Sequence, residues 1–352
     1  MINKAKLETQ LDTYAQLLVG CINNYAYVPE FINGEVSSLA NTRLLCQTRS
    51  IFFLVDYAHI TKNPKYITYA TQLAKVIQSN YFCQNQQRFF QYPVINTTQN
   101  TSADKLLYEL AFVICAFAKL YAVNQDKSFL QIISQTKAYI FSQYYNRVNK
   151  FEAMLNPQTG LNQNSFMHLF EAMLEAVSII DDVQLHNEFH DFANDLLSVI
   201  YDNSAQLIRE NSLVAIYEPG HSFEWASLLL EAQQKNLFKS TIDYNSLVSQ
   251  AEKYGVSQQQ LVFAEIQLDA KPHGNVFRIW PLLEQIRFYA MRAQPEKLDK
   301  SLSALNNVFF AKDNLPYEYV NDKLEPQQTL VKSTTGYHII NCYKYILQLS
   351  TL

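Results

Sequence analysis

Apolar residues recur along most of this chain at the three- and four-residue spacing of an amphipathic helix. The clearest stretches are 106–117, which includes Leu106, Leu110 and Phe117, and 166–177. Strict alternation of apolar and polar residues, which would indicate strands, is scarce. The pattern therefore predicts an all-α protein.

Short polar segments separate these apolar stretches and predict helical hairpins. Segments 61–64, 124–126 and 181–182 each lie between two helical patterns. The stretches 58–76 and 119–138 share one outline, in which a helix ends, a polar turn follows and an aromatic residue leads the next helix. We therefore expect a succession of helix pairs.

Polar or aromatic residues of functional type recur near the expected starts of alternate helices, at intervals of 53 to 60 residues. If six hairpins close into a ring, the inner helices run parallel, and residues early in each of them converge on one mouth. We predict an (α/α)6 barrel built from six helical hairpins, as a single domain of residues 1–352. The alternative is an open helical solenoid, in which the same positions line a groove. The six positions are Arg49, Tyr108, His168, His221, Trp280 and His338.

The segment 218–225, Glu-Pro-Gly-His-Ser-Phe-Glu-Trp, carries the clearest chemical signature. Pro219 suits the first turn of a helix, and Gly220 leaves the entry to that helix uncrowded. His221, Glu224 and Trp225 follow at i, i+3 and i+4, so they project together. The positive end of the helix favours a neutral, proton-accepting imidazole, and the carboxylate one turn later can orient it. We expect a general base beside an aromatic platform, with helix capping as the alternative role for His221.

Composition narrows the classes of function. With 352 residues, 48% of them apolar, the chain can bury a large core. Seven glycines, without a G-x-G-x-x-G or P-loop pattern, argue against a nucleotide cradle. The formal net charge of −4, without a basic block, gives no indication of nucleic acid or an anionic membrane surface. His186 and His190 lie one helical turn apart but lack a third ligand, so no metal site is expected. A small neutral ligand fits best.

Cysteine usage and the N-terminus bear on the cellular compartment. The five cysteines are odd in number and never form C-x-x-C, which indicates reduced thiols. The first residues lack the compact apolar region of a signal peptide. The longest uninterrupted apolar run, 110–118, is far shorter than the ~20 residues that a membrane helix needs. We expect a cytoplasmic protein without a membrane segment, as a monomer or homodimer.

Five motifs in order resemble the N-acylglucosamine 2-epimerase superfamily, in particular its mannose isomerase and phosphomannose isomerase-like branch. The resemblance covers most of the chain. It implies an (α/α)6 barrel whose chemistry moves a proton at the carbon next to a sugar carbonyl, without a metal or cofactor. The motifs are Thr42-Arg43-Leu44 with Gln47-Thr48-Arg49, residues 166–172, residues 218–225, Trp280-Pro281 with Glu284, and Tyr337-His338.

The same resemblance implies roles for individual residues. His221 and His338 would be the acid/base pair, with Glu224 supporting His221. An aldose–ketose isomerase needs two such groups poised near neutral pH, together with donors for the developing oxyanion. The residues implied to contact the substrate or shape its pocket are Arg49, His168, Trp225 and Trp280.

Some of these positions have structural alternatives. Tyr108 fits the aromatic core as well as it fits a sugar contact. His168 lies among apolar neighbours and can be a core histidine, and Arg49 can be the ion-pair partner of Glu109 or Asp56.

The sequence also departs from the family pattern. Ser227 stands where the family often has a second tryptophan, and Leu282-Leu283 stands where it often has Gln-Thr. These changes bear on the identity of the substrate more than on proton transfer. We predict a sugar isomerase of the mannose/fructose type that works through an enediolate. The alternatives are a 2-epimerase acting on an N-acylhexosamine or a disaccharide, a glycoside hydrolase using Glu224 and Glu171, and a non-catalytic helical scaffold.

Overall fold

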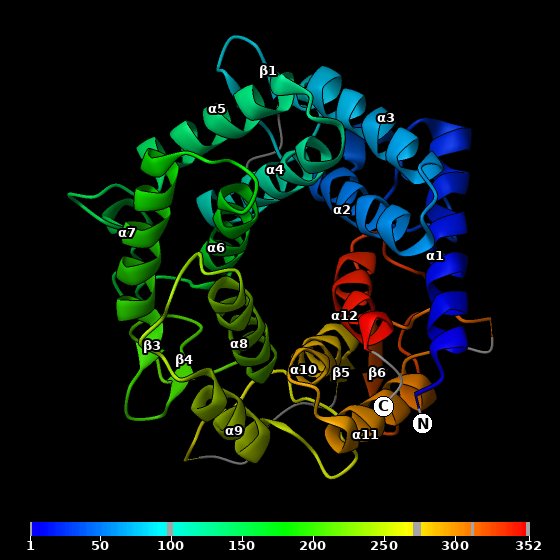
Figure 1. Cartoon of the computed structure of the whole chain (residues 1–352), viewed down its shortest axis with the longest axis vertical. Coiled ribbons are helices and arrows are strands. Elements are labelled where there is room, and N and C mark those ends of the chain that lie inside the picture. Colours follow the sequence, from blue (N-terminus) through cyan, green and yellow to red (C-terminus); the bar gives the residue numbers. More distant parts are fainter. Residues whose placement is uncertain (1, 97–100, 270–275, 311–312, 350–352) are drawn as a thin grey trace.

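The computed structural model describes residues 2–96, 101–269, 276–310 and 313–349, which form a closed ring of helices (Figure 1). The ends of the predicted domain, residues 1 and 352, lie outside the described residues. Each inner helix packs against the inner helices on either side, and the last, α12, packs against the first, α2. This closure confirms the all-α prediction and the (α/α)6 barrel, and it rules out the open solenoid. The inner helices are α2 (Leu44–Thr61), α4 (Ala103–Asn124), α6 (Asn164–Val177), α8 (Pro219–Gln234), α10 (Ile279–Met291) and α12 (Gly336–Gln348).

Outer helices cover the ring, and each packs mainly on one inner helix. Five of the resulting pairs are consecutive hairpins, as predicted. The sixth pair joins α1 to α12, the two ends of the chain, which lie near each other in Figure 1. The outer helices are α1 (Lys4–Tyr25), α3 (Lys65–Asn80), α5 (Lys127–Gln143), α7 (Val183–Ile200), α9 (Tyr244–Gly255) and α11 (Pro295–Val308).

Connections at the two ends of the barrel differ in length. Several turns from an inner to an outer helix are short, and Lys62 and Gln125 end α2 and α4 in the left-handed conformation, at φ 54° and 56°. Glycine usually takes this C-terminal position. Here lysine and glutamine take it, so the small number of glycines in the chain does not prevent tight turns. The connections that lead back to inner helices are long and contain the 3₁₀ helices and strands. These are η1 (Leu39–Asn41), η2 (Val94–Asn96), η3 (Glu152–Met154), β1 (Phe82–Cys83), β2 (Arg88–Phe89), β3 (Tyr201–Asp202), β4 (Leu207–Ile208), β5 (Val276–Arg278) and β6 (Tyr319–Asn321).

Helix α4 shows why the inner wall is so apolar. Within the described ranges it is the one helix long and apolar enough to cross a bilayer by length and composition alone, with 72% of the relevant window buried inside the protein. It packs against α2, α5 and α6. A helix surrounded by other helices is apolar on most of its faces, and this position accounts for its composition.

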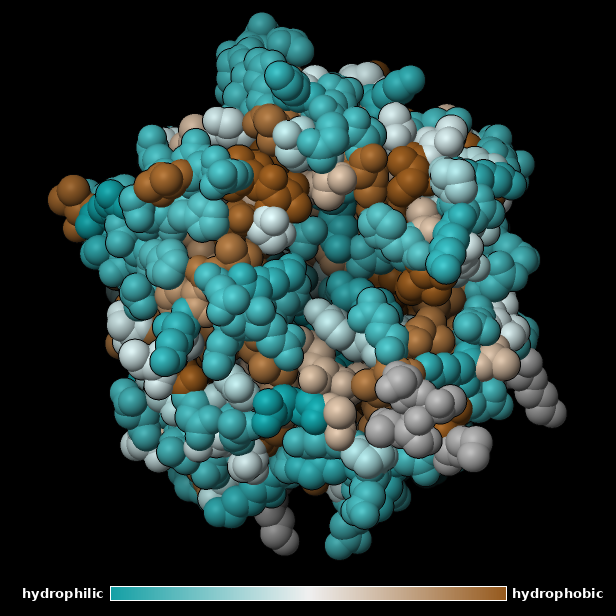
Figure 2. All heavy atoms as spheres, in the orientation of Figure 1, coloured by the Kyte–Doolittle hydropathy of each residue, from teal (hydrophilic) through white to brown (hydrophobic). Residues whose placement is uncertain are grey.

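The end of the barrel where the inner helices finish has a charged interior. The face shown in Figure 2 is mostly hydrophilic and is hollowed near its centre. A cavity of about 450 Å³ is lined by residues late in α2, α4 and α12, among them Asp56, Lys119 and Lys344. Asp56 accepts hydrogen bonds from Lys119 at 2.7 Å and from Lys344 at 3.2 Å, so one carboxylate links three inner helices.

Candidate active site

The six regularly spaced sequence positions all lie in the first or second turn of an inner helix. Because these helices run in the same direction around the ring, the six side chains gather at one end of it, as the spacing predicted. They are Arg49 in α2, Tyr108 in α4, His168 in α6, His221 in α8, Trp280 in α10 and His338 in α12.

Trp280 lies between two histidines. The centroid of its ring is 5.0 Å from that of His221 and 5.5 Å from that of His338. Gly220 permits this close approach, because a Cβ atom at that position would come within 2.7 Å of the indole. The indole therefore separates two imidazoles that come from helices on either side of it.

His221 is held by two carboxylates. Its Nδ1 lies 2.9 Å from Glu210 Oε1 and 3.3 Å from Glu218 Oε2. Burial alone would lower the pKa of His221, but Glu210 and Glu218 outweigh it and raise that pKa to about 10. The structure thus corrects two expectations. The imidazole is cationic at neutral pH rather than neutral, and its hydrogen-bonding carboxylate is Glu210 rather than Glu224.

A second layer of side chains anchors Glu210. The amide of Gln163 approaches the Glu210 carboxylate at 3.3 and 3.4 Å, and Trp225 Nε1 donates to Gln163 Oε1 at 2.8 Å. Trp225 is fully buried and packs against Phe170. The predicted place of Trp225 in the substrate pocket is therefore corrected, because it reaches His221 only through Gln163 and Glu210. Sequence reasoning missed Glu210, which lies in the loop after β4.

His338 has the opposite protonation state. Its Nδ1 lies 2.6 Å from Oε1 of the fully buried Glu284, whose other oxygen accepts from Arg287 at 3.2 Å. Burial, reinforced by the positive charge of Arg49, holds the pKa of His338 well below its usual range. Trp280 thus has the cationic imidazole of His221 on one side and the neutral imidazole of His338 on the other.

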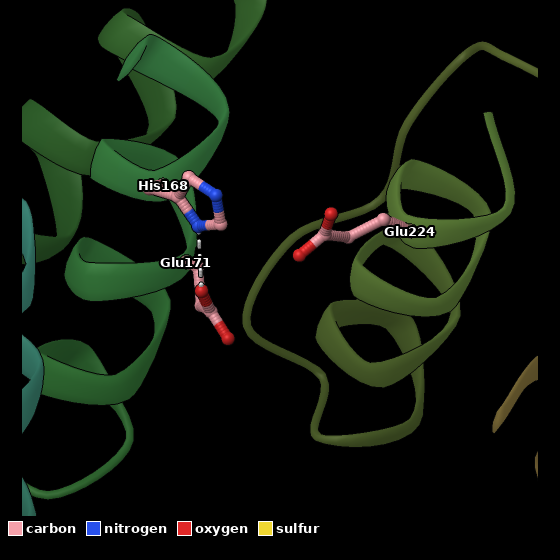
Figure 3. A group of neighbouring side chains, drawn as sticks. All are labelled: His168, Glu171 and Glu224. Atoms are coloured by element: carbon pink, nitrogen blue, oxygen red, sulfur yellow. Dashed lines mark hydrogen bonds and ion pairs between the residues drawn. The ribbon is translucent and has the colours of Figure 1, made fainter. Parts of the chain in front are cut away.

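A third histidine, His168, lies near Glu171 and Glu224 (Figure 3). His168 Nδ1 is 3.2 Å from Glu171 Oε2, and Tyr337 donates to the same carboxylate at 2.5 Å. Burial lowers the pKa of His168 to about 4. Glu224 extends from α8 toward this pair, and its Oε1 has no hydrogen-bond partner among the described residues. Burial and the neighbouring acidic groups raise the pKa of Glu224 well above its usual range, which favours the neutral acid.

Arg49 is a buried cation surrounded by aromatic rings. Its guanidinium carbon is 4.4 Å from the ring centroid of Phe112, and Nη2 donates to the Tyr108 hydroxyl at 2.5 Å. No carboxylate in the described part of the chain lies within ion-pair distance of it. The two alternative partners bond elsewhere, Asp56 to Lys119 and Lys344 and Glu109 to Gln91. Arg49 is therefore available to an oxygen atom of a ligand.

A cavity of about 390 Å³ lies beside Tyr108. Its lining is polar and includes Gln91, Asp104 and Asn164. Such a wall offers hydrogen-bond donors and acceptors for hydroxyl groups next to the histidine-lined end of the barrel.

Three groups of one histidine and two carboxylates have the side-chain types that bind divalent cations. In each group the potential ligand atoms lie within 4.8 Å of one another. The Nδ1 atom of each imidazole already approaches a carboxylate, so a metal would bind at Nε2 or replace the contact at Nδ1. The groups are His168–Glu171–Glu224, Glu210–Glu218–His221 and Glu224–Glu284–His338.

The closed (α/α)6 barrel is shared with solved carbohydrate epimerases and isomerases, and this chain belongs to that class of enzyme. A profile of the N-acylglucosamine 2-epimerase family matches residues 32–342, and the chain belongs to this family. The resemblance seen in the motifs is thereby confirmed.

Individual relatives include both isomerases and epimerases. A mannose-6-phosphate isomerase of Rhizobium meliloti (strain 1021) is 27% identical over 270 residues, which are 69% of this chain and 69% of that protein. The solved structure of a D-mannose isomerase has a TM-score of 0.77 at 16% identity, with 97% of each chain covered. Cellobiose 2-epimerase from Bacillus thermoamylovorans B4167 has a TM-score of 0.75 at 16% identity, with 96% of this chain and 98% of that one covered. The two solved structures share the fold of this chain.

Proposed function

We propose that the protein is an aldose–ketose isomerase that interconverts mannose and fructose. The observation that carries this proposal is the pair of oppositely protonated histidines, His221 and His338, on the two sides of Trp280. Isomerisation needs one group that gives a proton and one that takes it at the same pH. The mannose isomerase and mannose-6-phosphate isomerase among its relatives support this choice of sugar.

The protonation states assign the two roles. Both histidines direct Nδ1 to a carboxylate, which leaves Nε2 for the substrate. Cationic His221 donates a proton to the ring oxygen and the bond between that oxygen and C1 breaks. The neutral imidazole then takes the proton of the C1 hydroxyl, so the aldehyde forms and His221 is cationic again. Neutral His338 then takes the C2 proton, and the electron pair moves through the C1–C2 bond to O1 to give the enediolate. His338 returns the proton to C1 while the proton of the O2 hydroxyl passes to O1, which completes the ketose.

Arg49 and its neighbours would stabilise the enediolate. The Arg49 guanidinium has no carboxylate partner among the described residues, and its low-dielectric surroundings strengthen its attraction for an oxyanion. Tyr108 and His168 lie next to it, with their rings 4.7 Å apart. We assign these three residues to the substrate oxygens and Trp280 to the apolar face of the sugar.

The 2-epimerase alternative uses the same two histidines differently. If cationic His221 delivers a proton to the opposite face of C2, the product is the C2 epimer instead of a ketose. The family description and the cellobiose 2-epimerase fold keep this alternative open. A glycosidase has less support, because Glu171, the candidate nucleophile, is buried and already engaged by His168 and Tyr337.

The proposal assigns no step to a metal ion. It also includes a cytoplasmic location, which the five cysteines support because all of them are free. A small sugar is the proposed ligand, and a monomer or homodimer the proposed assembly.

The test is turnover of mannose, glucose, N-acetylmannosamine and cellobiose after exhaustive treatment with EDTA. We expect fructose from mannose, and full activity with EDTA present. The variants His338→Gln and His221→Gln should each lose roughly 10²–10⁴-fold in kcat, the usual contribution of an acid or base group. Activity that disappears with EDTA and returns with Mn²⁺ or Zn²⁺ would refute the metal-free mechanism. Unchanged turnover in either variant would refute the assignment of the histidines.

A further inference from the structure

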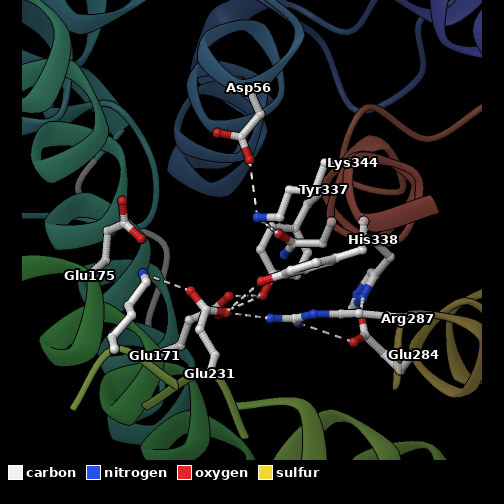
Figure 4. A network of polar contacts seen from close by, with 12 residues as sticks. Asp56, Glu171, Glu175, Glu231, Glu284, Arg287, Tyr337, His338 and Lys344 are labelled. Atoms are coloured by element: carbon white, nitrogen blue, oxygen red, sulfur yellow. Dashed lines mark hydrogen bonds and ion pairs between the residues drawn. The ribbon is translucent and has the colours of Figure 1, made fainter. Parts of the chain in front are cut away.

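A chain of buried ionic contacts runs from His338 into the barrel (Figure 4). Nδ1 of His338 contacts Glu284, Glu284 accepts from Nη1 of Arg287, and Nη2 of Arg287 reaches Oε2 of Glu231 at 3.2 Å. The side chains of Arg287 and Glu284 are 1% and 0% exposed. An ion pair this deeply buried is costly to desolvate and is weak support for a role in stability alone.

The contact between His338 and Glu284 has two possible proton positions. In the first, Nδ1–H donates to an ionised Glu284 and Nε2 carries the free lone pair. In the second, a neutral Glu284 donates to Nδ1, and the ring proton sits on Nε2. Only the first arrangement lets Nε2 accept a proton from a sugar, since the hydrogen bond at one ring nitrogen fixes the tautomer at the other.

Among the charges around Glu284, that of Arg287 decides which of the two proton positions is favoured. Burial raises the pKa of Glu284, and the negative charge of Glu171 on α6 raises it further. His168 and His338 are neutral at pH 7 because burial lowers the pKa of both. Glu224, Tyr337 and Cys342 also interact with Glu284, and burial raises the pKa of each and favours its neutral form. Within the described residues, Arg287 is the one cation at ion-pair distance from Glu284.

We propose that Arg287 is a positioning residue, which keeps Glu284 ionised and thereby holds His338 in the tautomer whose Nε2 can act as the base. This inference rests on the proposed function, because it gives a reason for the base role of His338. Arg287 touches no substrate in this account and acts only through Glu284.

Two variants test the proposal by removing the charge of Arg287, and two others serve as controls. Arg287→Gln removes the cation. The double variant R287M/E231M removes the cation together with its second carboxylate and refills the space with apolar side chains, a replacement that buried ion pairs tolerate. Arg287→Lys keeps the charge, and Glu231→Gln removes the neighbouring carboxylate while leaving Arg287 on Glu284.

The readouts are the ¹⁵N chemical shifts of His338 at neutral pH and the separate kcat and KM for mannose. Arg287→Gln and R287M/E231M should move the ring proton from Nδ1 to Nε2, and kcat should fall about 100-fold or more with KM within about threefold. Arg287→Lys and Glu231→Gln should keep the wild-type tautomer and lose less than about tenfold in kcat. Should Arg287→Gln not fold, the double variant carries the test.

The proposal is overturned if either charge-removing variant folds with the wild-type tautomer of His338. It is also overturned if Glu231→Gln loses as much kcat as Arg287→Gln. Failure of the proposed function looks different. In that case the wild-type protein turns over no sugar, and the tautomer comparison still decides whether Arg287 sets the proton position.

Discussion

The two histidines that we propose as catalytic differ in the groups that surround each Nδ1 atom. His221 faces Glu210 and Glu218, and among the described residues neither carboxylate forms an ion pair with a lysine or arginine. His338 faces Glu284 alone, and Glu284 divides its charge between the imidazole and Arg287. One imidazole is therefore held as an acid and the other as a base at the same pH, although both occupy the first turn of an inner helix.

The protonation of His221 predicts the alkaline limit of activity. Because its pKa is raised to about 10, the acid form persists through neutral pH, and kcat/KM should fall only as pH rises through about 10. Glu210→Gln removes one of the two carboxylates that raise this pKa, so the alkaline limb should move to lower pH. A profile of kcat/KM against pH, with the exposed Glu296→Gln as control, measures the shift. An alkaline limb that stays in place in Glu210→Gln would contradict the role of Glu210.

Sequence reasoning located both histidines but mispredicted the charge of His221. The helix-dipole argument considers only the backbone of α8 and the residues that follow, whereas the dominant charge, Glu210, comes from a loop 11 residues earlier. A loop residue such as Glu210 belongs to no periodic pattern in the sequence. Its position next to His221 therefore becomes visible only in the closed fold. Glu284 was visible in its motif, yet its partner Arg287 was not, because an arginine one turn along a buried helix has no signature of its own.

At the scale of elements, helix starts were the most predictable feature. The turn residues at Pro219 and Gly220 and the intervals between functional side chains placed the inner helices correctly. The direction in which each side chain points was less predictable. Residues four apart on a helix differ by about 40° in direction, and in a ring each inner helix has neighbours on most sides. That difference turns Trp225 toward Phe170 of α6, while His221 faces Trp280 of α10.

The carboxylate of Asp56 should contribute strongly to the packing of α2, α4 and α12 against one another. Asp56 is paired with Lys119 and Lys344 in the buried end of the barrel. Asp56→Asn leaves Lys344 without its carboxylate partner and Lys119 with Glu175 alone, at 3.7 Å, and we expect a loss of about 3 kcal/mol in the free energy of unfolding. Urea denaturation at neutral pH measures it, with the exposed Asp322→Asn as the matched control. A loss below about 1 kcal/mol, within the usual range of surface substitutions, would contradict the account.

The pH dependence of this link has a definite sign. Burial alone would raise the pKa of Asp56, but the two lysines lower it to about 2 in the folded protein. A carboxylate with a depressed pKa stabilises the fold above its unfolded pKa of about 3.9, and this stabilisation is lost as pH falls from there through about 2. The difference in stability between wild type and Asp56→Asn should therefore shrink over that acid range.

At the scale of the whole molecule, the site depends on closure of the ring by the two ends of the chain. Helix α1 packs on α12, and the Tyr14 hydroxyl accepts from the backbone N–H of Gly336 at 2.9 Å and donates to the carbonyl of Lys332 at 2.7 Å. A Cβ at position 336 would collide with the Tyr14 ring, at 2.3 Å. The helix that carries His338 is thus seated by a helix that precedes the stretch matched by the family profile. The local periodicity of the sequence gave no indication of this contact.

The most direct test of the central claim is proton NMR of the purified protein with mannose in deuterated buffer containing EDTA. The account predicts that the C2 proton signal of mannose disappears and that fructose appears, with no added metal. Deuterium enters at C1 of the ketose in the fraction of turnovers in which the proton on His338 exchanges with the solvent before it is returned. The absence of both exchange and product would contradict the claim that His221 and His338 form a working acid/base pair for this sugar.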